Sequence, residues 1–242
     1  YIKARLFDML IGDWDRHADQ WRWAEHHIEN QIIYRPIPRD RDQAFTIYNG
    51  KLLSILMTMP AMRHMQGFKK EIRNVKWFNM AAYPMDLAFL KKSNEQDWIE
   101  QAQFIQNNLT KEAINAAFAK LPQEFQDQTV EEVKNLLEVR KEKLTAYATS
   151  YYKTLSKTVV LAGTNKKDKF IIERLPKGAT KIVVIRDKKS GEEIQFEKIY
   201  HKNETKEIWI YGLQDDDTFL VKGKGSNPIK LRIMGGLDKD LY

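Results

Sequence analysis

The chain contains no cysteine among its 242 residues, which excludes disulfide bonds, thiolate catalysis and cysteine-ligated metals. It has no apolar run approaching the roughly 18 residues that a membrane-spanning helix requires. Its histidines form no H-E-x-x-H set, and neither a G-x-S-x-G elbow nor a Walker loop occurs. The common hydrolase and P-loop nucleotidase classes therefore lack support in the sequence.

The sequence also lacks long blocks of residues with the same charge. The net charge is +7 and the pI is near 9.3, but the basic residues are scattered. Scattered charge is usually a solvated surface, so nucleic acid is not expected as a partner, while polyanion binding by the basic C-terminal half stays open. No secretory signal is present, and the chain starts with Tyr inside a helical pattern. We interpret it as a piece of a longer protein.

Helix signals dominate residues 1–156. Apolar residues recur every three or four positions, and polar capping residues precede several of these runs. The sequence predicts helices over 2–11, after a capping box at 93–96, after Thr110 and after Thr129. The last helix is expected to continue to Leu155 and to bury a stripe of Val133, Leu137, Leu144, Tyr147, Tyr151 and Leu155. Irregular core helices are expected over 52–90, with gap-filling roles for Met57, Met59, Met62 and Met65.

The apolar period changes to two after residue 156. Turn residues separate seven short apolar runs: 159–161, 170–172, 182–185, 194–196, 208–211, 218–221 and 229–233. Such spacing is typical of a small antiparallel sandwich of immunoglobulin-like type. The predicted fold class is therefore α+β, with a mostly helical region over 1–156 and a seven-stranded sandwich over 157–242. We interpret the acidic stretches 215–217 and 235–240 as turns rather than calcium sites.

Two acidic loops carry the pattern that points to chemistry. Asp15 and Gln20 lie five positions apart, which is the spacing of the catalytic Asp and metal-binding Asn in the kinase pattern D-x-x-x-x-N. A predicted hairpin over 21–36 follows, and Asp40 comes directly after it. Phosphoryl transfer needs a carboxylate near the acceptor hydroxyl and oxygen ligands for Mg²⁺. The predicted helix, first loop, hairpin and second loop follow one another in the sequence, and the two loops carry the carboxylates and the amide oxygen that this chemistry needs.

These motifs resemble three groups of kinases. Residues 15–21, D-R-H-A-D-Q-W, resemble the D-R-x-x-D-N-W motif of type II phosphatidylinositol kinases. Residues 36–45, P-I-P-R-D-R-D-Q-A-F, resemble the I-P-W-D-x-D-x-x-F motif of spore-coat CotH-type protein kinases, and HipA-type kinases share a D-x-H-x-x-N theme. The resemblance implies a protein-kinase-like C-lobe that works with Mg²⁺ and ATP.

The resemblance also implies roles for individual residues. Asp15 corresponds to the catalytic base, with Arg16 and His17 as positioning residues. The implied metal ligands are Gln20, Asp40 and Asp42. Gln20 replaces the Asn of the family motif and is one methylene longer. No Gly-rich phosphate loop or ATP-binding strand lysine precedes the motif, so we expect the isolated chain to bind no cofactor and to transfer phosphate poorly or not at all. A degenerate, pseudokinase-like site is the alternative.

A longer stretch, reaching residues 211–217 and 233–238, is similar to a segment of large Gram-negative envelope proteins. Those proteins carry a metallophosphoesterase domain at one end and a surface-antigen outer-membrane barrel at the other. This similarity implies a location in the cell envelope, with other domains of the parent chain, an envelope protein or a polymer as partners. The alternative function is a non-catalytic module that links domains of an outer-membrane-associated protein.

The acidic loops also have a purely structural interpretation. Asp40 and Asp42 alternate with Arg39 and Arg41, which favours a local network of ion pairs. The sequence leaves this alternative open beside the metal site.

Overall fold

The computed structural model describes residues 1–29, 31–48, 50–188 and 191–242. The chain divides into two compact units. The helical unit comprises Tyr1–Asp86 and Ser93–Tyr152, and the β unit comprises Leu87–Lys92 and Lys153–Tyr242. The fold is mixed α+β, as the sequence predicts. The β unit begins shortly before the predicted junction at residue 156 and takes in one short segment from the helical half.

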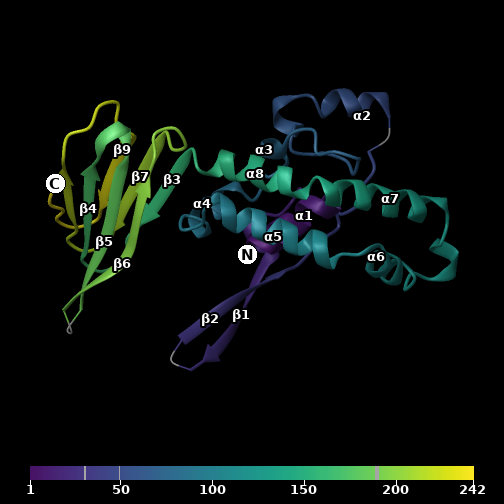
Figure 1. Ribbon diagram of the computed structural model, residues 1–242, viewed down its shortest axis with the longest axis horizontal. Coiled ribbons are helices and arrows are strands. Elements are labelled where there is room, and N and C mark those ends of the chain that lie inside the picture. The colour runs from purple at the N-terminus through teal and green to yellow at the C-terminus, as the bar shows by residue number, and fades with distance from the viewer. Residues whose placement is uncertain (30, 49, 189–190) are drawn as a thin grey trace. The chain divides into compact units, whose positions relative to one another are not determined.

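The helical unit begins with α1 (Ile2–Ile11), and a 3₁₀ turn, η1 (Ala18–Gln20), leads into the hairpin of β1 (Trp21–Ile28) and β2 (Gln31–Pro38) (Figure 1). The remaining elements follow in chain order: α2 (Lys51–Leu56), η2 (Pro60–Met62), α3 (Val75–Phe78), α4 (Tyr83–Phe89), α5 (Glu95–Asn108), α6 (Lys111–Phe118), η3 (Gln123–Phe125), α7 (Gln128–Glu142) and α8 (Leu144–Leu155). Within the described ranges, no helix combines the length and the apolar character that crossing a bilayer would require.

The core of the helical unit forms where α1 packs against α5 and α7. Leu6, Met9 and Leu10 of α1 are fully buried, which confirms the predicted inward face. Trp98 of α5 is also fully buried and meets the Tyr151 ring edge-on, with ring centroids 5.5 Å apart. All six residues of the predicted C-terminal stripe are buried. Each large side chain removed from water in this way contributes about 1.5–3 kcal/mol.

Helix ends differ from the sequence predictions by small shifts. The capping box of α5 is centred on Asn94: its side-chain oxygen accepts from Asp97 N–H at 3.1 Å, and the Asp97 carboxylate accepts from Asn94 N–H at 2.8 Å. Asp127, rather than Thr129, caps α7. The predicted single long helix is wrong, because α7 ends at Glu142 and α8 begins at Leu144. The apolar stripe continues across the break because both helices bury the same face, so the sequence pattern does not show where one helix ends.

The predicted irregular helices of 52–90 correspond to the short elements from α2 to α4. Of the methionines assigned to gap filling, Met57 is buried, whereas Met59 is half exposed. The exposed member cannot fill a core gap, so that part of the prediction is wrong.

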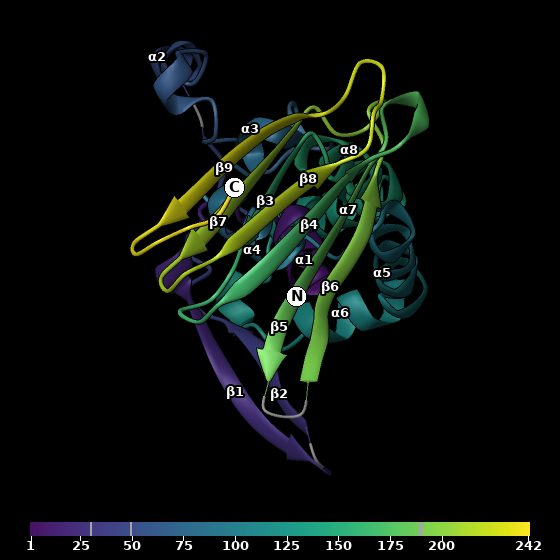
Figure 2. The same ribbon diagram turned by 90° about the vertical axis from the view of Figure 1, so that its left-hand side faces the viewer.

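The β unit contains a strand at each position where the sequence predicts one: β3 (Thr158–Ala162), β4 (Asp168–Arg174), β5 (Thr180–Lys188), β6 (Gly191–Tyr200), β7 (Glu207–Leu213), β8 (Thr218–Lys222) and β9 (Lys230–Gly236), with a 3₁₀ turn, η4 (Pro176–Gly178), after β4. They form a sheet of order β3-β7-β9 and a sheet of order β6-β5-β4-β8 (Figure 2). Burial alternates along β3, β4 and β7, as the period of two predicts.

Strand direction departs from the prediction. Strands β4, β5 and β6 are antiparallel neighbours, but β7 runs parallel to both β3 and β9, and β8 runs parallel to β4. The predicted wholly antiparallel arrangement is therefore wrong. The inward side chains of both sheets share one apolar cluster: Val159, Leu161, Phe170, Ile172, Ile182, Val184, Phe196, Tyr200, Ile208, Ile210, Phe219 and Ile229.

Candidate functional site

The backbone brings the two acidic loops together. Gly12 ends α1 with a left-handed φ of 82°, and a Cβ there would stand 2.9 Å from the Phe68 ring. The first loop then turns back over the helix end. The hairpin returns the chain so that Arg39 N–H donates to the Gln20 carbonyl at 2.8 Å and Phe45 N–H donates to the Ile11 carbonyl at 2.9 Å. The loop before β1 and the loop after β2 are therefore hydrogen-bonded neighbours.

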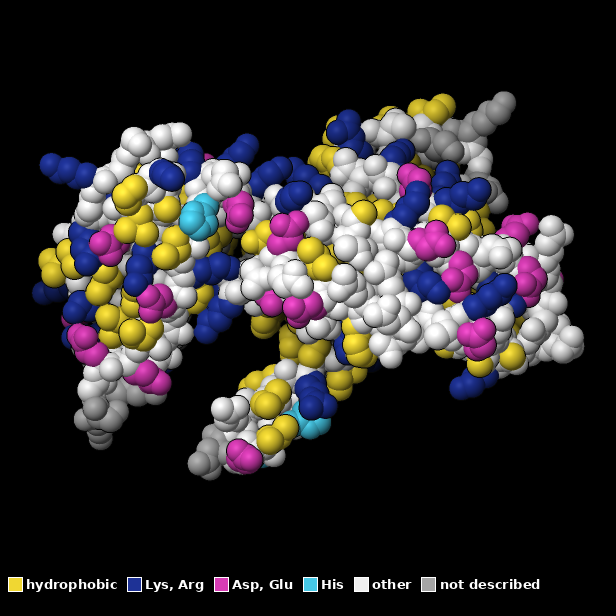
Figure 3. Space-filling view, viewed as in Figure 1, with side chains coloured by type: hydrophobic (Ala, Val, Ile, Leu, Met, Phe, Trp, Pro, Cys, Tyr) yellow, Lys and Arg dark blue, Asp and Glu magenta, His cyan; other side chains and the backbone are white. Residues whose placement is uncertain are grey.

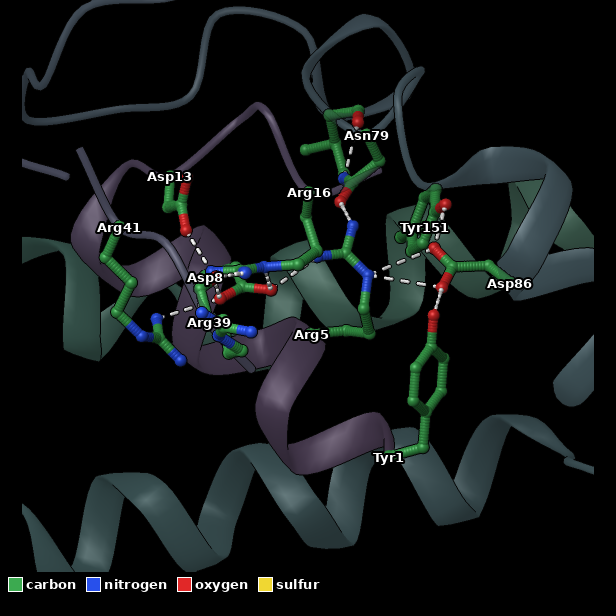
Figure 4. Close-up of polar contacts among 11 residues, drawn as sticks. Tyr1, Arg5, Asp8, Asp13, Arg16, Arg39, Arg41, Asn79, Asp86 and Tyr151 are labelled. Carbon is green, nitrogen blue, oxygen red and sulfur yellow. Dashed lines mark hydrogen bonds and ion pairs between the residues drawn. The ribbon is translucent and has the colours of Figure 1, made fainter. Parts of the chain in front are cut away.

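A buried ion network lies beneath these loops, with Asp8 of α1 at its centre (Figure 4). The Asp8 carboxylate accepts from Arg5 at 2.7 Å, from Arg16 at 3.1 and 3.2 Å, and from Arg41 at 2.9 Å. One side chain from the helix, one from the first loop and one from the second loop thus meet on a single carboxylate. Because Asp8 and Arg16 are fully buried, removing either partner would leave an uncompensated charge in the core.

Asp86 of α4 closes the other end of this network. Its carboxylate accepts from Arg5 Nε at 3.2 Å and from the hydroxyls of Tyr1 at 2.7 Å and Tyr151 at 2.5 Å. Burial, followed by the neighbouring Asp86 charge, raises the pKa of both tyrosine hydroxyls, so they remain protonated donors. Arg5 also donates to Asn79 at 2.7 Å. The network therefore ties α1, α3, α4 and α8 together.

The surroundings of Asp13 disfavour its negative charge. Its carboxylate pairs with Arg16 and is 1% exposed, and its Oδ1 has no hydrogen-bond partner in the described part of the chain. Burial, followed by repulsion from Asp8, raises the pKa of Asp13 to about 6 even though Arg16 and Arg41 act in the opposite direction. The side chain is close to changing its protonation state near neutral pH.

Asp15, the predicted base, lies half-buried outside this network. Across residues 1–29, 31–48, 50–188 and 191–242, its carboxylate makes no hydrogen bond or ion pair. Next to it in the chain, Trp14 donates through Nε1 to the Tyr48 hydroxyl at 3.2 Å, and that hydroxyl donates to Gln43 at 3.0 Å. Burial raises the pKa of Tyr48, and the charges of Asp15 and Asp42 add to this effect. Each acidic loop thus contributes a negative charge that acts on the same tyrosine.

Gln20, the predicted metal ligand of the first loop, is only 6% exposed. Its backbone N–H donates to the His17 carbonyl, and its backbone carbonyl accepts from Arg39. The side-chain oxygen is buried and has no hydrogen-bond partner among the described residues. Such an atom costs about 1–3 kcal/mol when nothing binds it. An oxygen ligand held in place without a donor is the arrangement that a bound cation would satisfy.

Asp40 and Asp42, the predicted ligands of the second loop, are both exposed. Asp40 adopts a left-handed φ of 54°, and its Oδ1 accepts weakly from Asp42 N–H at 3.4 Å. Arg41 does not form the predicted ion pair with its neighbours Asp40 and Asp42. Its guanidinium binds Asp8, 33 residues earlier, instead. The reason is physical: a buried carboxylate binds a cation more strongly than a hydrated one does.

Arg16 and His17 differ sharply in their surroundings. Arg16 is fully buried, and besides its two carboxylate partners it donates to the Arg39 carbonyl of the second loop. His17 is about half exposed, with Nδ1 4.0 Å from the carboxylate of Asp19. In the part of the chain that the structure covers, no three His, Asp or Glu side chains gather closely enough to hold a metal ion. Any divalent cation here would rely on Gln20 as well as on carboxylates.

Sequence reasoning missed most of the ion network. The sequence offered one signal of the network. Arg5 and Asp8 are three residues apart on the predicted helix, and each is adjacent to a residue of its inward face. Asp86 and Asn79 carried none, because their partner lies more than 70 residues away. Comparison with known proteins adds no identification: no family model, curated protein or solved structure matches this chain.

Proposed function

We propose that the helical unit is a kinase-like phosphotransferase lobe, with Asp15 as the base and with Gln20 and Asp40 as ligands for Mg²⁺. One observation carries this proposal: the Gln20 side-chain oxygen is buried without a partner in the described chain, and the backbone of Gln20 is hydrogen-bonded to Arg39, the residue before Asp40. The proposal includes a protein-kinase-like C-lobe fold for this unit and an immunoglobulin-like class for the β unit.

The proposed division of labour follows from the burial of each side chain. Asp15 is half-buried and unpaired in the described part of the chain, so its carboxylate is free to accept the proton of an acceptor hydroxyl. Arg16 is enclosed by Asp8 and Asp13 and reaches the second loop, so it positions the two loops rather than touching a substrate. His17 lies at the exposed edge of the same loop.

The residues at hand suit Mg²⁺ and ATP in their chemistry. Mg²⁺ prefers oxygen ligands and keeps several waters, so an amide oxygen and one or two carboxylates are a sufficient protein contribution. Gln20 offers an unpartnered oxygen, and Asp40 and Asp42 are exposed carboxylates on the adjacent loop. When bound, Mg²⁺ with ATP supplies the transferable phosphoryl group and neutralises its charge.

Metal binding tests this proposal directly. No resident Mg²⁺ or ATP is expected in the isolated chain, but its loop oxygens should still bind added Mn²⁺, a paramagnetic substitute for Mg²⁺. We expect this binding to be at least about tenfold weaker in Asp40→Ala and Gln20→Ala, since each removes one ligand. Asp19→Ala is the matched control, because its carboxylate is 96% exposed on the same loop. Gln20→Asn, which restores the residue of the kinase motif, is expected to retain binding. Wild-type protein without Mn²⁺ affinity, or equal weakening in the control, would refute the assignment.

A non-catalytic role in the cell envelope is the second candidate. It is favoured by the enclosure of Asp8, Asp13 and Arg16, whose charges bind one another inside the unit and hold the loops in one shape. In that case the lobe would join neighbouring domains of an envelope protein. The same titration separates the two roles, because a purely structural lobe has no reason to bind Mn²⁺ through Gln20.

A further inference from the structure

A second polar feature of the helical unit lies away from the acidic loops. A recess of about 330 Å³ opens between η2 and α3 and is lined by Thr58, Arg63, Arg73, Asn74 and Trp77. Figure 3 shows Lys and Arg side chains gathered over this part of the unit. None of the lining residues is acidic, and both arginines are exposed. The lining of the recess therefore presents two cations and no carboxylate, and the Glu71 carboxylate lines a neighbouring recess that shares Arg73.

Both arginines are held in place by uncharged groups. Arg63 Nε donates to the Thr58 carbonyl at 3.1 Å, and its guanidinium lies 5.6 Å from the centre of the Trp77 ring. Arg73 donates through one Nη to the Met57 carbonyl at 3.2 Å. Throughout the described ranges, neither arginine pairs with a carboxylate. Because a guanidinium carries five N–H donors, each retains donors for a ligand.

The wall that carries Trp77 is fixed by hydrogen bonds. Asn74 caps α3 by accepting from Trp77 N–H at 3.1 Å. The backbone of Asn74 is clamped in turn by the buried Gln66, which accepts from its N–H at 3.1 Å and donates to its carbonyl at 2.9 Å. A ligand entering the recess would therefore meet an arrangement that exists before binding, which lowers the cost of ordering it.

The surrounding charge also favours an anion. Lys76 Nζ lies 5.8 Å from the Trp77 ring centre, on the helix that borders the recess. Glu71 is the acidic residue closest in sequence to Arg73. It forms an ion pair with Lys143, which caps α7, and that pair lowers the pKa of Glu71. Its negative charge is thus already matched by a lysine, and the charged residues that line the recess are both cations.

We propose that this recess is a binding site for a phosphate-bearing group. Guanidinium forks match the tetrahedral oxygens of phosphate in bidentate fashion, and two such forks together favour a doubly charged group over a single carboxylate. The volume lies at the lower end of the range for small-ligand pockets, which suits a head group more than an extended molecule. The assignment is independent of the proposed phosphotransferase, since neither Asp15 nor bound Mg²⁺ takes part in it.

Calorimetric titration of the chain with inorganic pyrophosphate tests the site. Binding is expected to weaken about tenfold or more in Arg63→Gln and in Arg73→Gln, because each substitution removes charge-assisted hydrogen bonds. Lys70→Gln is the matched control: it removes the same charge from an exposed position of the same segment and does not line the recess. Sulfate is expected to compete with pyrophosphate, and acetate is not.

Two further arms identify the source of the phosphate. A phosphoserine peptide and vesicles containing phosphatidic acid are compared, each against its unphosphorylated or neutral counterpart, in wild type and in Arg73→Gln. Binding of either that depends on Arg73 supports the site and names the source. Absence of pyrophosphate binding to wild type, or an equal loss in Lys70→Gln, overturns the proposal. Circular dichroism of each variant, unchanged from wild type, shows that lost binding does not reflect unfolding.

Discussion

Asp13 should make the stability of the helical unit depend on pH in a direction opposite to that of most carboxylates. Its pKa rises from 3.8 to about 6 in the folded chain, chiefly because it is buried. The folded state therefore holds this proton more tightly than the unfolded state does. The stabilisation is complete below the unfolded pKa and is lost as pH rises through the folded pKa.

The magnitude follows from the size of the shift. A rise of about two pKa units, at about 1.36 kcal/mol per unit, corresponds to about 3 kcal/mol. Asp13→Asn keeps the shape of the side chain and an acceptor for Arg16 but cannot ionise. The free energy of unfolding of this variant, relative to wild type, should therefore increase by about 3 kcal/mol between about pH 3 and pH 7.

Urea unfolding followed by tryptophan fluorescence measures this difference, because five of the six tryptophans lie in the helical unit. Asp217→Asn is the matched control. Asp217 is also 1% exposed, and burial raises its pKa to about 6, but it belongs to the β unit. Its substitution should leave the transition of the helical unit unchanged. Parallel pH profiles for wild type and Asp13→Asn would refute the reasoning.

Two further substitutions test the buried charges. Asp8→Ala should lower the free energy of unfolding by about 3–5 kcal/mol, because it leaves the arginines around it without their shared carboxylate. The control Asp97→Ala removes only a capping carboxylate and should cost about 1 kcal/mol. Similar losses for the two variants in urea unfolding would argue against the network. Arg140→Met should cost at least about 2 kcal/mol, because the guanidinium donates to the carbonyls of Met9, Leu10 and Lys69. An unchanged denaturation midpoint would contradict this role.

What the sequence could predict is what depends on near neighbours. Alternating burial of the strands and the inward face of α1 follow from side-chain periodicity, which acts over a few residues. The hairpin of β1 and β2 lies where the sequence predicts one. Cap positions were less secure, because Asn94 and Asp127 compete with neighbouring residues that also accept hydrogen bonds.

What the sequence could not predict depends on distant partners. Arg41 pairs with Asp8 and not with Asp40 or Asp42, because Asp8 is buried, and this burial arises only in the folded chain. Strand direction in the β unit is likewise set by which strands become neighbours, and short turns between strands say little about it. For the candidate site, the spacing of Asp15 and Gln20 directed attention to the loop before β1, but the enclosure of Arg16 was not foreseeable.

The order of the strands has a consequence for how the β unit folds. Strands β4, β5 and β6 are consecutive in the chain and can pair as they emerge, since only short connections have to close. The β3-β7-β9 sheet has no such local pair, because β3 must wait for a strand that begins at Glu207. Until then its apolar side chains stay exposed. The interval between the synthesis of β3 and that of β7 therefore leaves this sheet open to aggregation.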